Sequence, residues 1–453
     1  MKVLVIKTSS LGDIVHANPI ISDLKKNLND IDKQSVKHYL CSEGLISSKK
    51  TFFKNIFSLP AGTYITIQNN ILKIRKYFEP LELFSKKKYM ENLSLNEETA
   101  LKVLKAKIKN SVKRHLVSNT KIGVTCSGGI DSSLILAITS QFKKNMMIFT
   151  NVSSGIEKLS ALIPKIVKKN NISTNHVFLI KQNKFNYIYD LTKLVKKNFF
   201  PARWGGGPPM NNLCKEAKIR GVNVLLGGDG LDEYFCGYET FNECLNKKKF
   251  DYHKILKINK RFNIKKNEIN NFNRDIFKLN KKISKKIRFI KNRNEKTIIK
   301  NSILDTQFFL QNCTLPHADE YSMDASIEMR NPFLDLDLVE YCLNLPGKFK
   351  ISKKSNFKNK YLIKKLAIRK YGRFINKKKE GTRNYSKFIS KKEYWNFENF
   401  KIRKIIKIHH TLTYKEFFKL INLEILIRAG INNEMDYLKN MLSQKGLRTF
   451  RTN

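Results

Sequence analysis

The chain of 453 residues has no apolar run long enough to span a membrane and no hydrophobic segment leading to a secretory cleavage site. Its seven cysteines are scattered, and none of them forms a C-x-x-C pair. These absences argue against a membrane span, a disulfide framework and a cysteine-based zinc site. We therefore expect a cytoplasmic protein, long enough for about two or three domains with a substantial core.

Acidic residues are scarce: 38 Asp and Glu stand against 87 Lys and Arg, which gives a net charge of +49. One interpretation is a nucleic-acid-binding protein. However, the basic residues are spread as runs such as 281–282 and 377–379, without the interleaved aromatic residues of an RNA-binding platform. Lysine, asparagine and isoleucine are frequent throughout, which favours a compositional bias of the genome. We expect no specific nucleic-acid partner, only weak attraction to polyanions.

The most informative stretch is Cys126–Ser133, which reads CSGGIDSS and lies between an apolar run at 121–125 and a helix-forming run at 134–138. This order predicts a strand, a glycine turn and a helix. Such a turn directs backbone N–H groups and the positive end of a helix at one point, which suits a phosphate. The lysine of a Walker loop is missing. The alternative is a serine-rich helix start that binds nothing.

A second turn of the same kind follows the apolar run Val222–Leu226 and reads GGDGLDE over residues 227–233. In an open parallel sheet, ligands bind beyond the carboxyl ends of neighbouring strands, so the two turns are expected to form one nucleotide and metal site. Asp131 and Asp232 would hold Mg²⁺, which bridges phosphate oxygens. The alternative is that Asp229 and Asp232 cap a helix over residues 234–244. The residues expected to contact the nucleotide in the two turns are Cys126, Ser127, Gly128, Gly129, Asp131, Ser132, Gly227 and Gly228.

The two motifs in this order, SGGxDS and GDGxDExFxGY, resemble the asparagine synthetase family, whose synthetase domain cleaves ATP between its α- and β-phosphates. The resemblance implies a PP-loop ATP pyrophosphatase fold. This agrees with the alternation of strands and helices, which predicts an α/β protein with a doubly wound parallel sheet, here with a helical C-terminal half. The resemblance also implies that Asn151 lies near the adenine, that Asp229 is the general base and that Lys379 is a catalytic lysine. Lys377 and Lys378 are alternatives in neighbouring registers.

The reaction implied by the resemblance is ATP-dependent amide formation with ATP and Mg²⁺. Aspartate would give asparagine through β-aspartyl-AMP, with release of AMP and pyrophosphate. Two alternatives stay open. The substrate is another carboxylate, such as a sugar acid of cell-surface polysaccharide synthesis, or the chain is a rearranged pseudoenzyme.

Four segments are expected along the chain. Residues 1–30 resemble the start of heptosyltransferases, and residues 31–90 resemble the C-terminal remnant of a glutaminase domain. Residues 91–430 form the synthetase region, and residues 431–453 are a basic tail. No cysteine precedes Cys41, which is expected in a strand-like segment without a free α-amine beside it. We therefore expect ammonia as the nitrogen source, supplied from solvent or by a separate glutaminase subunit.

Several other residues carry expectations. Arg203 either pairs with a substrate carboxylate or is an ordinary loop arginine. The stretch Met323–Asp335 matches the helical half of the family, and its charged residues Glu328, Arg330 and Asp335 are expected to form a buried ion-pair network. The match continues over residues 360–365 and ends in a helix over residues 417–426.

Overall fold

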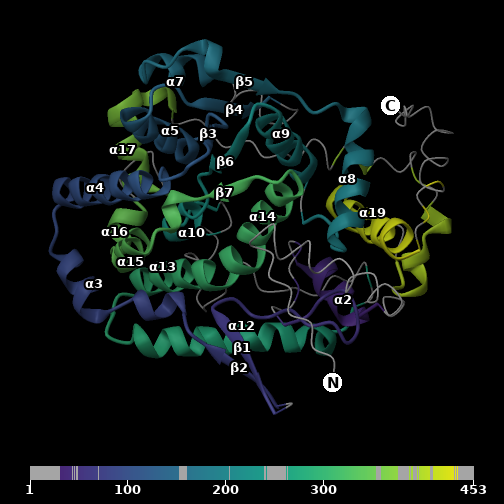
Figure 1. Cartoon of the computed structure of the whole chain (residues 1–453). Coiled ribbons are helices and arrows are strands. Elements are labelled where there is room, and N and C mark those ends of the chain that lie inside the picture. The colour runs from purple at the N-terminus through teal and green to yellow at the C-terminus, as the bar shows by residue number, and fades with distance from the viewer. Residues whose placement is uncertain are drawn as a thin grey trace.

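The computed structural model in Figure 1 places a parallel sheet between layers of helices. It describes residues 31–42, 44, 46, 49–69, 71–152, 161–203, 205–238, 241, 262, 264–352, 359–375, 387, 389–390, 395, 397–408, 412–432, 434 and 436. The segments 1–30 and 437–453, which were expected to be a heptosyltransferase-like start and most of a basic tail, lie outside the described residues.

The sheet has five parallel strands in the order β5-β4-β3-β6-β7. Its strands are β3 (Lys121–Thr125), β4 (Met147–Asn151), β5 (Val177–Ile180), β6 (Val222–Leu226) and β7 (Glu328–Arg330). The two strands that precede the glycine turns, β3 and β6, are direct neighbours. Parallel strands end at the same edge of a sheet, so both turns lie at one edge, as the sequence predicts.

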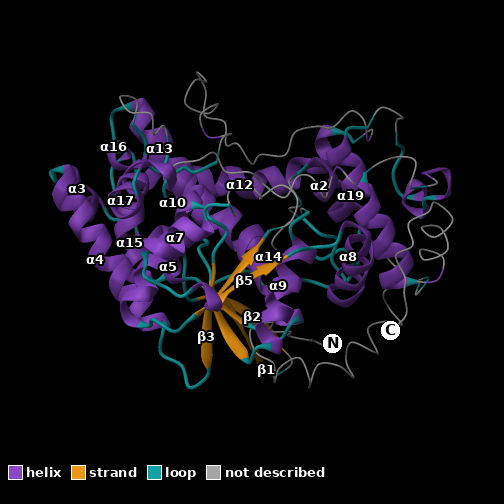
Figure 2. Cartoon of the chain, turned by 90° about the horizontal axis from the view of Figure 1, so that it is seen from above, coloured by secondary structure: helices purple, strands orange, loops and turns teal. Residues whose placement is uncertain are grey.

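Each face of the sheet packs against its own helices (Figure 2). On one face, Val124 and Ile148 join the large core that includes Ile135 of α5 (Ile130–Phe142). On the other face, Phe149 and Leu225 form a second core with α9 (Gly207–Ile219). Successive side chains of a strand point to opposite faces, which explains why neighbouring residues enter different cores. The predicted doubly wound α/β fold is confirmed.

The C-terminal half is mostly helical, as predicted, and one of its segments completes the sheet. Residues 328–330, expected within the helical half, form the edge strand β7, which pairs in parallel with β6. Backbone pairing with β6 decides this conformation, because three residues have no periodicity of their own. The remaining longer helices are α3 (Lys86–Leu93), α4 (Glu97–His115), α7 (Ile163–Lys169), α8 (Lys184–Asn198), α12 (Lys266–Lys286), α13 (Arg293–Leu304), α14 (Leu315–Asp324), α15 (Leu336–Asn344), α17 (Tyr361–Tyr371) and α19 (Tyr414–Ile425).

Short helices and π-helical segments connect these elements. Among them are α10 (Leu231–Tyr234), α16 (Gly347–Lys350) and the π-helical segments Asp305–Thr314 and Leu426–Ile431. The predicted last helix over 417–426 is confirmed by α19. The helix α7 begins at Ile163 and has a proline in its first turn. None of the described helices combines the length and apolar character that a bilayer crossing requires.

Residues 33–41 form the helix α2 (Lys33–Cys41), so the prediction that Cys41 lies in a strand-like segment is wrong. Asp32 caps this helix by accepting hydrogen bonds from the backbone N–H groups of Gln34 and Ser35. The buried face of α2 enters the large core, where the Tyr39 hydroxyl donates to the carbonyl oxygen of Ala202 at 2.6 Å. The helical conformation is stabilised here because the apolar face of α2 is buried against the core.

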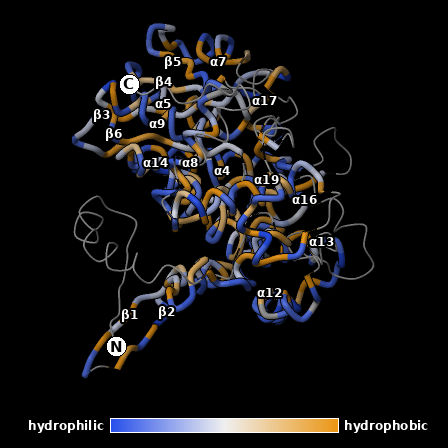
Figure 3. Tube along the Cα trace, turned by 90° about the vertical axis from the view of Figure 1, so that its right-hand side faces the viewer, coloured by the Kyte–Doolittle hydropathy of each residue, from blue (hydrophilic) through white to orange (hydrophobic). Residues whose placement is uncertain are grey.

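Next comes an antiparallel hairpin of β1 (Thr63–Gln68) and β2 (Ile71–Lys76). It projects from the body of the molecule, as Figure 3 shows near its lower left edge. Most of its side chains are exposed, including Ile67 and Ile74.

The buried imidazole of His38 gives a testable pH dependence. His38 lies in α2 with its ring centroid 5.2 Å from that of Phe272 of α12. Burial, together with the nearby charge of Lys50, lowers the pKa of His38 from its ordinary 6.5 to about 4. Between these values the unfolded chain binds a proton that the folded chain does not, so the free energy of unfolding falls as pH falls.

We expect His38→Phe, which keeps a ring against Phe272, to lose this part of the pH dependence. Urea unfolding between pH 7.5 and pH 4 measures it. The wild type should lose stability relative to the variant only below about pH 6.5. A constant difference between the two proteins across this range would contradict the prediction.

Candidate active site

The first glycine turn links β3 to α5 and is closed by its own serines. The backbone N–H of Ser127 donates to the Ser132 hydroxyl at 3.1 Å, and the two hydroxyls lie 3.2 Å apart. Gly128 has a positive φ of 79°, which a side chain would strain. No described side chain caps the N-terminus of α5. The first-turn N–H groups of this helix therefore have no side-chain acceptor within the described chain, which suits an anion.

The second turn lies against the first. A Cβ atom added to Gly228 would lie 3.1 Å from the backbone nitrogen of Ser132, a tight contact that a side chain could make only if the two turns moved slightly apart. A Cβ on Gly227 would overlap the side-chain oxygen of Asn331. The two turns therefore lie side by side, and the residues predicted to bind a nucleotide gather at this edge of the sheet. That they form one nucleotide site stays a prediction.

Asp131 and Asp232, one from each turn, meet at a single cation. The Lys360 ammonium lies 2.5 Å from Asp131 Oδ2 and 2.7 Å from Asp232 Oδ1. The three side chains are largely buried, with 9% of the lysine and 16–17% of each aspartate exposed. Together they carry one net negative charge. The two carboxylates that the sequence assigns to a metal are therefore brought together, with a lysine between them.

The residues present fit a Mg²⁺ ion that takes some of its oxygen ligands from the protein and the others from a nucleotide. The second oxygen of Asp131, Oδ1, is buried and bonds to no described group. Among the described residues, no cluster of three His, Cys, Asp or Glu side chains could hold a metal by itself. Two carboxylates are what Mg²⁺ usually takes from a protein when phosphate oxygens and water complete its octahedron.

The interpretation of Asp229 and Asp232 as helix caps is not supported. The N-cap of α10 is Gly230, with φ of 117° and no side-chain cap. The predicted helix over 234–244 is wrong at its start, because α10 ends at Tyr234 and Cys236 has a positive φ of 55°. The backbone N–H of Asp229 donates to Asn331 Oδ1 at 3.3 Å, which fixes the turn against the end of β7.

Glu233 follows the turn directly, and its side chain has a structural role. Its carboxyl accepts hydrogen bonds from the hydroxyls of Tyr238 at 2.6 Å and Thr314 at 3.2 Å. Burial, with the nearby charge of Asp232, raises the pKa of Glu233 to about 8. The carboxyl is therefore mostly neutral at pH 7, which removes the cost of burying a charge.

Comparison with known families agrees with this geometry. Residues 103–399, more than half of the chain, match the family model described as asparagine synthase. The chain belongs to the asparagine synthase family. The matched segment includes both glycine turns, Asp229, Lys360 and Lys379.

Three curated relatives show the extent of the similarity. Asparagine synthetase [glutamine-hydrolyzing] 1 of Bacillus subtilis is 24% identical over 75% of this chain and 56% of its own length. The putative asparagine synthetase [glutamine-hydrolyzing] 1 of Methanocaldococcus jannaschii is 24% identical over 64% of this chain and 43% of its own. Asparagine synthetase B of Escherichia coli is 26% identical over 45% and 38%. The chain thus spans about half the length of the curated relatives it matches.

The other predicted residues have varied outcomes. Asn151 ends β4, the strand next to β3, where the Thr150 hydroxyl donates to the Cys126 carbonyl at 2.8 Å. Cys126 itself is buried, and its thiol lies 4.0 Å from the Ser133 hydroxyl at the start of α5. Lys379, with Lys377 and Lys378, lies outside the described residues, so its role stays a prediction.

The charged residues of the helical half have structural partners. Arg203 donates to the Asn312 carbonyl at 2.7 Å and lies over the Phe200 ring, as expected of a loop arginine. Arg330 donates to Glu328 at 2.8 Å and to two carbonyls at the C-terminal end of α4, and Asp335 pairs separately with an arginine of α4. The prediction of one buried ion-pair network is therefore wrong. The charged residues form two separate local pairs, and the Glu328 side chain is 59% exposed.

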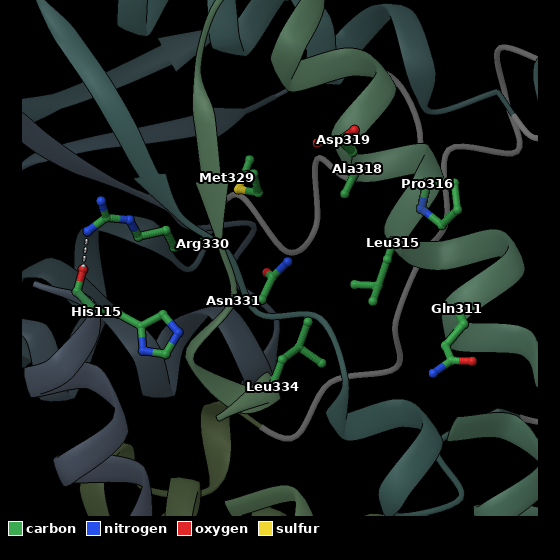
Figure 4. A pocket seen from close by; sticks show the side chains of 10 residues that line it. All are labelled: His115, Gln311, Leu315, Pro316, Ala318, Asp319, Met329, Arg330, Asn331 and Leu334. Carbon is green, nitrogen blue, oxygen red and sulfur yellow. Dashed lines mark hydrogen bonds between the residues drawn. The ribbon is translucent and has the colours of Figure 1, made fainter. Parts of the chain in front are cut away.

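A cavity of about 470 Å³ lies between the end of β7 and α14. Figure 4 shows Met329 and Asn331 on one side of it and residues of α14, among them Leu315 and Asp319, on the other. In the same view the Arg330 side chain extends away toward the backbone of His115. Asn331, which lines this cavity, also accepts the hydrogen bond from the backbone N–H of Asp229 and so connects the cavity wall to the second turn.

Sequence reasoning missed Lys360 and Asn331. A signal for Lys360 exists: it is the N-cap of α17, where a cation is unfavourable for the helix dipole. A lysine at that position therefore indicates a partner elsewhere. Asn331 follows β7 and had no such signal, because β7 itself is defined only by its pairing.

Glu233 provides a test of this arrangement. At pH 7 we expect Glu233→Gln to change the free energy of unfolding little, since a neutral amide oxygen still accepts from Tyr238 and Thr314. Glu233→Ala should cost about 1–3 kcal/mol, because both hydroxyls lose their acceptor. Urea unfolding measures both variants. Equal losses for Gln and Ala would show that the ionised carboxylate is needed instead.

Proposed function

We propose that this chain catalyses ATP-dependent amide-bond formation and converts aspartate into asparagine through β-aspartyl-AMP, with release of AMP and pyrophosphate. The observation that carries the proposal is the meeting of Asp131 and Asp232, from two glycine turns on adjacent parallel strands, at one cation. Membership of the asparagine synthase family supports it.

Each part of the site has a task in this proposal. The N–H groups of the first turn and of α5 bind the phosphates, and the hydroxyls of Ser127 and Ser132 rotate to donate to them. Asp131 and Asp232 hold Mg²⁺, which supplies charge stabilisation for the phosphates when bound. Asn151, at the end of the neighbouring strand, contacts the adenine. Lys379 stabilises the charge that develops as pyrophosphate leaves.

Asp229 is proposed as the general base that removes a proton from the attacking ammonia. The turn that carries it is fixed by the hydrogen bond to Asn331, so its position relative to the cavity is set by the fold. The carboxylate substrate would bind in that cavity. Adenylation is needed because a free carboxylate is a poor electrophile, and the mixed anhydride provides a good leaving group.

The size of the cavity favours a second candidate substrate class. At about 470 Å³ it falls within the range of about 300–1,000 Å³ typical of drug-sized ligands. A carboxylate larger than aspartate, such as a sugar acid, would therefore fit. The guanidinium groups of Arg203 and Arg330 each donate to a backbone carbonyl of the protein, so we assign neither of them to the selection of aspartate. A panel of carboxylates with one pyrophosphate assay separates the two candidates.

Removal of either metal ligand should abolish the reaction. With ATP, Mg²⁺, ammonia and the carboxylate panel, we expect Asp131→Asn and Asp232→Asn each to lower pyrophosphate release by at least about a hundredfold, the scale of one lost transition-state interaction. An amide keeps the size of the side chain but loses the anionic ligand that Mg²⁺ requires.

The matched control is Asp275→Asn, which removes an exposed carboxylate of α12 far from the turns in sequence and should change nothing. Wild-type protein that releases no pyrophosphate with any carboxylate would exclude the proposed reaction. Full activity in either site variant would exclude the proposed metal ligands.

The nitrogen donor is expected to be ammonia rather than glutamine. Glutamine must first be cleaved by an activated nucleophile, usually a cysteine thiolate. Five of the six described cysteines are buried, and burial raises the pKa of the Cys126, Cys214 and Cys342 thiols. Buried thiols of raised pKa are poor nucleophiles.

Product formation with ammonium chloride and with glutamine at equal concentration, together with glutamate release, measures this preference. We expect amide product with ammonium and no glutamate with glutamine. Glutamate release by the purified chain would contradict the prediction and indicate a glutaminase site within it. Addition of a separate glutaminase that restores the use of glutamine would agree with an external supply.

A further inference from the structure

Lys360 is held between the two metal-ligand carboxylates by contacts on both its backbone and its side chain. Its N–H donates to the Phe235 carbonyl at 3.1 Å, and the preceding Asn359 side chain donates to the Gly237 carbonyl at 3.0 Å. The lysine adopts a left-handed backbone with φ of 51°. These bonds join the start of α17 to the loop that follows α10.

Gly237 shows how closely this lysine fits. A Cβ atom there would overlap both Asp232 Oδ1 and Lys360 Cε. The aliphatic stem of the lysine thus runs over a glycine that leaves room for it, and its ammonium ends between the carboxylates. A left-handed backbone and a cation at a helix start both cost free energy, and the contact with the lysine stem requires glycine at position 237. The placement of this lysine is therefore closely defined by the fold.

The ammonium and a Mg²⁺ ion compete for the same oxygens. Mg²⁺ binds carboxylate oxygens at about 2.0–2.1 Å. Asp131 Oδ2 and Asp232 Oδ1 lie 2.5 and 2.7 Å from the ammonium nitrogen, so a metal bound to both would displace it. The ammonium also halves the net negative charge of the pair, which lowers its attraction for a divalent cation.

We propose that Lys360 is a counter-ion that keeps the metal site closed to free divalent cations until a nucleotide arrives. This inference rests on the proposed nucleotide and metal site, and it adds that the nucleotide binds before the divalent cation. Without nucleotide, Lys360 neutralises Asp131 and Asp232. The phosphates of an arriving nucleotide, bound by the turn next to Asp131, provide a new partner for the ammonium and further oxygen ligands for the metal. The carboxylates are then released to Mg²⁺.

Mn²⁺ binding without nucleotide tests this inference directly. Mn²⁺ takes the same oxygen ligands as Mg²⁺, and its free fraction is read by electron paramagnetic resonance. We expect Lys360→Met to bind Mn²⁺ at least about tenfold more tightly than the wild type, because the competitor and its charge are gone. Metal-free ATP should bind the variant more weakly, since the phosphates lose a cation.

Two controls locate the effect. Lys365→Met removes another lysine of α17, which pairs with Glu97 outside the site, and should leave the Mn²⁺ affinity within about twofold. In the double variant Lys360→Met with Asp232→Asn, the gain should disappear. Lys360→Gln, which keeps a hydrogen-bond donor without charge, repeats the test if the methionine variant does not fold.

Unchanged Mn²⁺ affinity in both neutral variants, or an equal gain in Lys365→Met, would overturn the proposal. The readout involves no carboxylate substrate or turnover. A wild type that releases no pyrophosphate but shows the expected Mn²⁺ response would therefore refute the proposed reaction and leave this inference intact. Normal turnover of the wild type with no change of Mn²⁺ affinity in the variants would refute this inference and leave the proposed reaction intact.

Discussion

Two negative charges are held close together at the edge of the sheet, and this is possible only because β3 and β6 are parallel neighbours. Their pairing directs both glycine turns to one side, and Gly228 lets the second turn approach the backbone of the first. Asp131 and Asp232 would repel one another without a cation between them. The positions of Lys360 and of a metal both follow from that constraint.

The helical half also contributes residues that contact the site directly. Asn331 reaches the Asp229 turn from the end of β7, and Lys360 reaches the carboxylates from the start of α17. The helix α2 and the synthetase region share one core, since Tyr39 bonds the carbonyl of Ala202. Segments from widely separated parts of the chain therefore fix the geometry of one edge of the sheet.

The sequence by itself determined the features with local signatures. Apolar runs of five residues followed by glycine turns predicted β3 and β6, and the helix-forming run after Ser133 predicted α5. Because parallel strands place their ends together, the same patterns predicted that Asp131 and Asp232 would share a site. The family resemblance was carried by these turns, and the family match includes them.

Tertiary structure alone decided what depends on distant partners. β7 exists because residues 328–330 pair with β6, and residues 33–41 are helical because one face of α2 enters the core. Glu233, one of three carboxylates within residues 229–233, points inward to Tyr238 and is neutralised by burial. Lys360 looked like one lysine among many until the fold placed it between two aspartates. Burial and long-range pairing leave no local pattern, because they are properties of the packed chain rather than of any segment.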